Sequence, residues 1–226
     1  MSALGRPRLH VREIGSTNDR ARALAQAGAP HGTLVTTGLQ TAGRGRQGRA
    51  WVTPPGQALL MSLLLRVVDP LLPLRAGLAV ADLAGPGALV KWPNDVLVDG
   101  RKVAGILVEA RPREGWAVLG MGINVALDVA GLPPELRSGA GTLGRPPGEL
   151  DAALAELLGH LDARLAEPPT AALDALRARD ALRGRPVTWA GGAGVGAGID
   201  AAGALLVRAP DGTLVALDAG EVHLGR

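Results

Sequence analysis

The stretch QTAGRGRQGRAW, residues 40–51, is the part of the sequence from which the rest of the chain is best interpreted. Three glycines alternate with three arginines between Gly43 and Arg49, and no apolar side chain among them anchors the segment in a core. Glycine lets the backbone approach a ligand closely, and arginine carries a fixed fork of donors that fits carboxylate or phosphate. The pattern predicts an anion-binding loop, with a solvated basic surface loop as the alternative.

The segments before this loop predict two strands with a helix between them. Residues 33–37 read as a strand that leads into the loop, and residues 9–14 alternate apolar and polar side chains as a half-buried strand does. Ser16, Thr17 and Asn18 precede a helical stretch that Gly28 ends. The two hydroxyls suit an N-cap, and they equally suit a polar ligand held at a helix N-terminus.

After the loop, residues 58–67 predict a strand buried on both faces, and residues 74–83 predict a helix. Residues 91–109 then predict a strand, a Pro-Asn-Asp turn and a hairpin that turns at Asp99-Gly100. This segment holds Lys91 and Lys102, which are the only two lysines in the sequence. Its Asn94 and Asp95 are turn formers in one interpretation and site residues in the other.

A further strand, residues 116–120, runs into Gly120-Met121-Gly122-Ile123-Asn124. Two glycines before an asparagine indicate backbone that approaches a ligand closely, although Asn124 also suits a plain bend. Residues 132–147 are rich in Pro, Gly and Ser and predict a loop.

The C-terminal third of the sequence predicts two helices followed by several short strands. Amphipathic helices are predicted over residues 149–166 and 170–182. From residue 183, five short β-like runs with intervening turns predict a small barrel, so we expect one domain over 1–182 and a barrel over 183–226. The glycines of residues 191–198 do not make a dinucleotide loop, because no helical stretch follows them.

Composition bounds the class of protein. The chain has 226 residues, 47% of them hydrophobic, with no Phe or Tyr and four Trp, so Leu, Val and Ala must fill the core. The absence of cysteine excludes disulfides and thiolate metal sites, and a net charge of +3 gives little support for a nucleic-acid partner. No signal-peptide core and no apolar run near the roughly 20 residues of a membrane span are present, so we expect a cytoplasmic protein without membrane contact.

Together these segments predict a polar pocket in which arginines and a lysine converge with carboxamides. Such a pocket suits a reaction in which negative charge moves between a carboxylate and a triphosphate, since preset positive charge stabilises that transition state. The sequence shows no Ser-His-Asp or Cys-His set, and its four histidines form no metal motif.

The motifs resemble those of the biotin–protein ligases, in the right order and over nearly the whole chain. The resemblance rests on Ser-Thr-Asn at 16–18, the Gly-Arg-Gly-Arg loop with Trp51, Lys-Trp-Pro-Asn-Asp at 91–95, residues 101–109 and Gly-Met-Gly-Ile-Asn at 120–124. It implies an α+β fold, with a mixed-sheet catalytic domain similar to class II aminoacyl-tRNA synthetases and then an SH3-like barrel. The implied reaction joins biotin and MgATP into biotinyl-5′-AMP, and then transfers biotin to a lysine of a biotin carboxyl carrier protein of acetyl-CoA or a related carboxylase.

The resemblance also implies residue roles. Biotin binding is expected at Ser16, Thr17, Asn18, Gln40, Gly43, Arg44, Lys102, Gly105 and Gly120. ATP binding is expected at Arg46, Arg49, Trp51, Asn94 and Asn124, with Mg²⁺ held mainly through the ATP phosphates near Asn94. The expected catalytic residues are Lys102, Arg44, Arg46 and Asp95, and Asp95 either orients a group or helps to deprotonate the acceptor lysine.

Two departures from the family and three alternatives accompany this interpretation. The catalytic motifs begin close to Met1, so we expect a form without the N-terminal DNA-binding domain of some relatives and no specific DNA binding. Aromatic residues that relatives place around the pocket are absent. A lipoate–protein ligase, a catalytically inactive ligase-like regulator and a nucleic-acid module remain the alternatives, and a homodimer is plausible.

Overall fold

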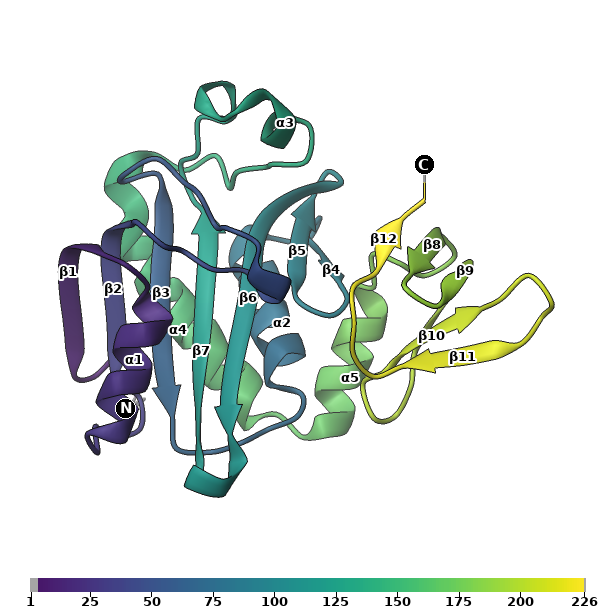
Figure 1. Ribbon diagram of the computed structural model, residues 1–226, viewed down its shortest axis with the longest axis horizontal. Coiled ribbons are helices and arrows are strands. Elements are labelled where there is room, and N and C mark those ends of the chain that lie inside the picture. Colours follow the sequence, from purple (N-terminus) through teal and green to yellow (C-terminus); the bar gives the residue numbers. More distant parts are fainter. Residues whose placement is uncertain (1–3, 226) are drawn as a thin grey trace.

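The computed structural model describes residues 4–225, which form two β-sheets with helices packed around the larger one (Figure 1). The larger sheet has seven strands in the order β1-β2-β3-β7-β6-β5-β4. Only β1 and β2 pair in parallel, so the sheet is mixed, as the sequence resemblance implies. The strands are β1 (Arg8–Ile14), β2 (Leu34–Gln40), β3 (Ala58–Leu65), β4 (Leu89–Lys91), β5 (Asp95–Val98), β6 (Arg101–Arg111) and β7 (Trp116–Asn124).

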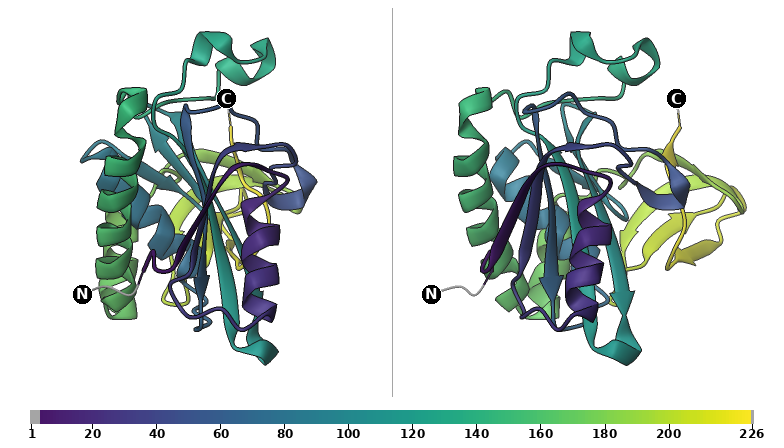
Figure 2. Two further views of the ribbon diagram at one scale, coloured as in Figure 1. Left: turned by 90° about the vertical axis from the view of Figure 1, so that its left-hand side faces the viewer. Right: turned by 60° about the vertical axis from the view of Figure 1, so that its left-hand side comes forward.

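Helices cover both faces of this sheet. Helix α1 (Thr17–Gln26) packs on β2, β3 and β7, whereas α2 (Leu72–Ala84) and α4 (Leu150–Ala166) lie on the opposite face, with the sheet between them and α1 (Figure 2). Helix α5 (Pro169–Ala178) packs against α2. Strand β3 is an interior strand of the sheet, and every one of its residues is buried, which explains the nearly continuous apolar run in its sequence.

The smaller sheet is antiparallel and has five strands in the order β11-β10-β9-β8-β12. Its strands are β8 (Pro186–Trp189), β9 (Gly192–Ile199), β10 (Leu205–Arg208), β11 (Leu214–Leu217) and β12 (His223–Leu224). The glycine-rich run of residues 191–198 therefore lies mostly in strand β9. The indole N–H of buried Trp92 donates to the Gly203 carbonyl at 3.0 Å, which ties this sheet to the turn after β4. The SH3-like designation and the domain boundary at residue 183 stay predictions.

Two predicted elements differ in extent from the observed ones. The predicted loop over residues 132–147 contains the short helix α3 (Pro134–Arg137) and lies next to one end of β7 (Figure 1). The helix predicted to reach residue 182 ends at Ala178, because the following residues leave the helix to pair with β4 at Val90. Short 3₁₀ turns occupy Arg46–Gly48, Pro112–Glu114, Val129–Gly131 and Pro147–Glu149. Within residues 4–225 no helix combines the length and apolarity needed to span a membrane.

Candidate active site

A cavity of about 380 Å³ lies where the start of α1, the end of β2 and the loop after it meet strands β6 and β7. The motifs identified in the sequence therefore line a single cavity. Thirteen of the expected site residues line it: Ser16, Thr17, Asn18, Gln40, Arg44, Arg46, Arg49, Trp51, Asn94, Lys102, Gly105, Gly120 and Asn124. Gly43 and Asp95 do not line it, and each acts on a residue that does.

The floor of the cavity is polar and buried. The amide oxygen of Gln40 accepts the backbone N–H of Thr17 at 2.8 Å and lies 3.1 Å from the Thr17 hydroxyl. Ser16 occupies the N-cap position of α1, but its hydroxyl makes no capping hydrogen bond. The hydroxyl therefore does not cap α1; it lines the cavity, and its contact with a ligand stays a prediction.

Glycines on β6 and β7 make room for the side chains that shape the cavity. Gly105 and Gly122 are cross-strand partners, and a Cβ on either would contact the Trp51 ring, at 2.9 Å in the case of Gly105. A Cβ on Gly120 would collide with the Asn18 amide. The indole of Trp51 therefore lies on a flat patch of bare backbone, a close approach that only glycine permits. Gly122 was not among the predicted site residues.

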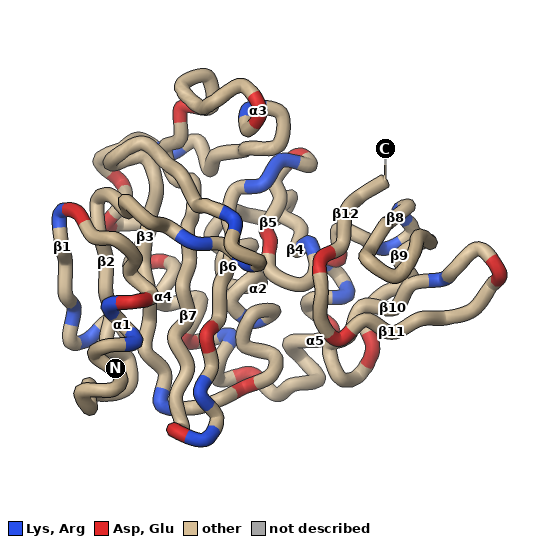
Figure 3. The backbone as a smooth tube through the Cα atoms, viewed as in Figure 1, with Lys and Arg blue, Asp and Glu red and all other residues tan. Residues whose placement is uncertain are grey.

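The loop after β2 folds back on itself as it crosses in front of β7 and β6, where its basic residues lie (Figure 3). The backbone N–H of Trp51 donates to the Gly43 carbonyl at 2.9 Å, and a Cβ on Gly43 would come within 2.6 Å of the Trp51 carbonyl oxygen. Gly43 therefore acts by letting the two arms of the loop close. Gln47 and Gly48 form the tip with positive φ angles of 54° and 74°.

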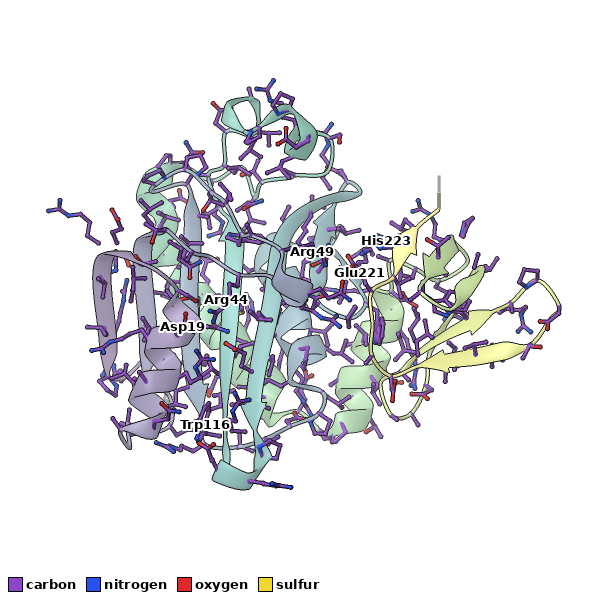
Figure 4. The ribbon with its side chains drawn as sticks, in the orientation of Figure 1. Asp19, Arg44, Arg49, Trp116, Glu221 and His223 are labelled. Atoms are coloured by element: carbon purple, nitrogen blue, oxygen red, sulfur yellow. The ribbon has the colours of Figure 1, made fainter. Side chains whose placement is uncertain are left out.

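Arg44 is held by acidic groups that lie outside the loop. Its guanidinium makes a bidentate pair with Asp19 at 2.6 and 2.9 Å, and it lies 3.9 Å from Glu109 (Figure 4). The hydrogen bond from Arg44, with the charges of Arg44 and Arg22, holds the pKa of the Asp19 carboxyl below its usual value. The same pairing raises the pKa of Arg44. The self-repulsion expected of an arginine-rich loop is thus offset by fixed carboxylates.

Arg46 and Arg49 each contact the segment that precedes β12 in the smaller sheet. Arg46 donates to the Gly220 carbonyl at 2.9 Å and to the Asn94 amide oxygen at 3.2 Å. Arg49 pairs with Glu221 at 2.5 Å, and Figure 4 shows Glu221 beside Arg49 at the connection that precedes β12. The connection between β11 and β12 therefore supplies partners to a loop of the larger sheet.

Both lysines of the chain meet one carboxylate. Lys102 lies 2.6 Å from Asp95 Oδ1, and Lys91 lies 3.7 Å from Asp95 Oδ2. Burial lowers the pKa of Lys91 against the opposing attraction of Asp95. The Lys102 ammonium also lies 5.5 Å from the centre of the Trp51 ring, a favourable cation–π geometry. Asp95 thus stands behind Lys102 and fixes the direction of its side chain into the cavity.

The far wall of the cavity comes from the segment that contains α3. Asn124 donates to the Gly141 carbonyl at 2.9 Å, and its amide oxygen is buried without a hydrogen-bond partner. Leu127, Leu132 and Leu136 add apolar surface, and Leu136 is 43% exposed at the rim. Together with Trp51, these leucines supply apolar lining in a chain that has no Phe or Tyr. Within the described part of the chain, no group of three or more His, Asp or Glu side chains is placed to hold a metal ion.

Sequence comparison defines the class of protein. The profile of the Biotin/lipoate A/B protein ligase family matches residues 11–126, and that of the Biotin protein ligase C terminal domain matches residues 193–225. The chain belongs to the Biotin/lipoate A/B protein ligase family.

Individual relatives agree with this assignment. The chain is 35% identical to the biotin–acetyl-CoA-carboxylase ligase of Paracoccus denitrificans, over 93% of this chain and 97% of that protein. It is 39% identical to the bifunctional ligase/repressor BirA of Bacillus spizizenii, over 65% of this chain but 49% of that protein, so it spans about half the length of such relatives. The structure of the Aquifex aeolicus biotin protein ligase in complex with biotin and ATP superposes with a TM-score of 0.83 and 27% identity, covering 98% of this chain and 99% of that one.

Proposed function

We propose that this protein activates biotin with ATP to form biotinyl-5′-AMP, and then transfers the biotinyl group to a lysine of a biotin carboxyl carrier protein. The observation that carries the proposal is one cavity with a buried polar floor at α1 and cationic groups from the loop and from β6. The floor suits a small polar ring, and the cations suit a carboxylate next to a phosphate. Relatives named as biotin ligases, and a related structure with biotin and ATP bound, support this choice.

In the first step a biotin carboxylate oxygen attacks the α-phosphorus of ATP, and the bond to the bridging oxygen breaks, so that pyrophosphate leaves. Arg44 and Lys102 attract the carboxylate and the α-phosphate to the same place, which lowers the entropic cost of bringing them into line. Arg46 and Arg49 face the outgoing phosphates, and Trp51 and Asn124 border the nucleotide. Mg²⁺ enters as part of the MgATP substrate near Asn94, consistent with the oxygen-poor donor set that the protein itself supplies there.

In the second step the amine of the acceptor lysine attacks the acyl carbon, and AMP leaves with the former carboxylate oxygen. Asp95 acts through Lys102, because its Oδ1 lies 2.6 Å from that ammonium. This contact favours the orienting role of Asp95 over the role of a base for the acceptor amine. The homodimer, the cytoplasmic location and the lack of specific DNA binding are further predictions of the sequence.

A mass-shift assay tests the proposed function. Purified protein is incubated with MgATP, a biotin carboxyl carrier domain and either biotin or lipoate. We expect a biotin-sized increase of the carrier and none with lipoate. A lipoyl-sized increase alone would reassign the protein to the lipoate branch of the family. No increase with either acid, in a protein that still binds biotin, would instead favour a ligase-like regulator.

A further inference from the structure

A chain of hydrogen-bonding groups lies at and beneath the cavity floor, and the mechanism proposed above assigns no role to its members Ser62 and Glu109. Ser62 is the one polar residue of β3 and is fully buried. Its hydroxyl oxygen lies 2.6 Å from Asn18 Oδ1 and 2.8 Å from the Thr17 hydroxyl. Asn18 Nδ2 lies 2.7 Å from Glu109 Oε2. The chain therefore runs from Glu109, on β6, to Thr17 on the floor.

The direction of each hydrogen follows from what the atoms are able to donate or accept. Glu109 is a carboxylate that faces Arg22 at 3.3 Å and Arg44 at 3.9 Å, so it only accepts. The amide nitrogen of Asn18 must therefore face Glu109, and the amide oxygen must face Ser62. Because an amide oxygen has no hydrogen to give, the single hydroxyl hydrogen of Ser62 goes to Asn18.

This arrangement also fixes where the hydrogen of the Thr17 hydroxyl points, and Thr17 lines the cavity. Because the hydrogen of Ser62 goes to Asn18, the 2.8 Å contact between the two hydroxyls takes the hydrogen of Thr17, in preference to the longer 3.1 Å contact of Thr17 with Gln40 Oε1. The Thr17 hydroxyl then presents only lone pairs to the cavity. The Gln40 amide oxygen, 3.1 Å away, already accepts the Thr17 backbone N–H and also presents a lone pair. Two adjacent acceptors, buried Thr17 and half-buried Gln40, call for a ligand that brings hydrogens.

We propose that Ser62, Asn18 and Glu109 are positioning residues that fix the Thr17 hydroxyl as an acceptor, so that the floor selects a ring with N–H donors. This inference rests on the proposed function and adds the physical basis of its selectivity. The cyclic urea of biotin carries two N–H groups, whereas the dithiolane of lipoate carries none. Gly120 supports the same hydrogen-bonded arrangement, because a Cβ there would displace the Asn18 amide.

Calorimetric titration of the full chain, without ATP, tests the inference. The ligands are biotin and its two cyclic carbamate analogues, in which one ureido N–H is replaced by oxygen. We expect the parent protein to bind biotin about 30-fold more tightly than at least one carbamate, because that oxygen leaves buried acceptors unpaired at a cost of about 2 kcal/mol. In Ser62→Ala the Thr17 hydroxyl is released to rotate and donate, and this ratio should fall below about 5-fold.

Two further variants make the result decisive. Glu109→Gln keeps the shape but is also able to donate, so it allows the Asn18 amide to turn, and the ratio should fall in the same way even where Ser62→Ala does not fold. Arg22→Gln removes the charge beside Glu109 Oε1 while leaving the Asn18 contact, and it should keep the parent ratio. Parallel loss of biotin and carbamate binding, with the ratio unchanged, would overturn the positioning role alone. A parent protein that does not bind biotin would overturn the proposed function as well.

Discussion

At the scale of single residues, the three arginines of the cavity loop have partners that lie far away in the sequence. Spacing and residue type predicted Arg44, Arg46, Arg49 and Lys102 as a group, because glycine-flanked arginines and a rare lysine stand out locally. Asp19, Glu109 and Glu221 carry no such signal. Each became part of the site only when α1, β6 and the end of the smaller sheet folded onto the loop. The sequence therefore predicted the charges that line the cavity, but not the carboxylates that hold the arginines.

Lys102→Arg preserves charge and should still slow biotinyl-adenylate formation by about a hundredfold or more. The ammonium is compact and fits between Asp95, Gly105 and the Trp51 ring, whereas a guanidinium is wide and needs a fork-shaped partner. Biotin-dependent exchange of pyrophosphate into ATP measures this step. Arg101→Lys, the reverse change at the exposed neighbour, should leave the rate unchanged. A Lys102→Arg rate within a few-fold of the parent would show that any cation serves.

Asp180 is expected to make stability depend on pH. Its Oδ2 is buried without a hydrogen-bond partner, and burial raises the pKa of the carboxyl although the Leu182 N–H and the charge of Arg183 oppose this. A carboxyl with a raised folded-state pKa favours folding most below its unfolded value and loses that contribution as pH rises through the folded value. Asp180→Asn should therefore gain stability over the parent as pH increases from 4 to 8. Urea unfolding at several pH values measures the difference, and a constant difference would contradict the assignment.

At the scale of elements, strands and helices with a clear apolar period were predicted close to their observed limits. The failures came where tertiary contacts decided the outcome. Pairing of Asp180 with β4 shortened α5, and the Pro-rich segment that borders the cavity contains α3. The Gly105–Gly122 patch is also a property of paired strands, because the sequence marks the two glycines separately and only the register places them side by side.

Gly122→Ala tests this patch. The added Cβ would collide with the indole of Trp51, so the ring must leave the sheet. We expect ATP binding to weaken at least about tenfold, with a smaller loss in thermal stability, as measured by titration calorimetry and calorimetric unfolding. Gly159→Ala, in the middle of α4 with open space around it, is the matched control and should stabilise by about 0.5–1 kcal/mol. Unchanged ATP affinity in Gly122→Ala would show that the position of Trp51 does not contribute to nucleotide binding.

At the scale of the whole molecule, the two sheets share the cavity loop. Arg49 and Arg46 extend from a loop of the larger sheet to Glu221 and to the Gly220 carbonyl beside β12. Neither contact was predictable, since nothing in the C-terminal sequence pattern indicated that the strands would lie against this loop.

Glu221→Gln weakens the pair with Arg49 and should free the loop. We expect trypsin to cut after Arg46 or Arg49 several-fold faster than in the parent, and the KM for ATP to rise while biotin affinity changes little. Timed proteolysis with mass spectrometry and steady-state kinetics provide the measurements. Asp218→Asn, an exposed carboxylate in the same connection, is the control. Equal cutting of Glu221→Gln and parent would mean that the Glu221 pair does not restrain the loop.

Arg46 and Arg49 line the cavity and also contact the segment before β12, so nucleotide binding and attachment of the smaller sheet are linked if both use the same donors. Arg46 and Arg49 each offer one set of donors, and under the proposed function the ATP phosphates would compete for them with the C-terminal partners. If nucleotide binding draws either guanidinium away from Gly220 or Glu221, the attachment of the smaller sheet must weaken by the same free energy by which that attachment had opposed nucleotide binding. Any macromolecule that docks on the β11–β12 connection would then change the nucleotide affinity of a cavity that it does not touch.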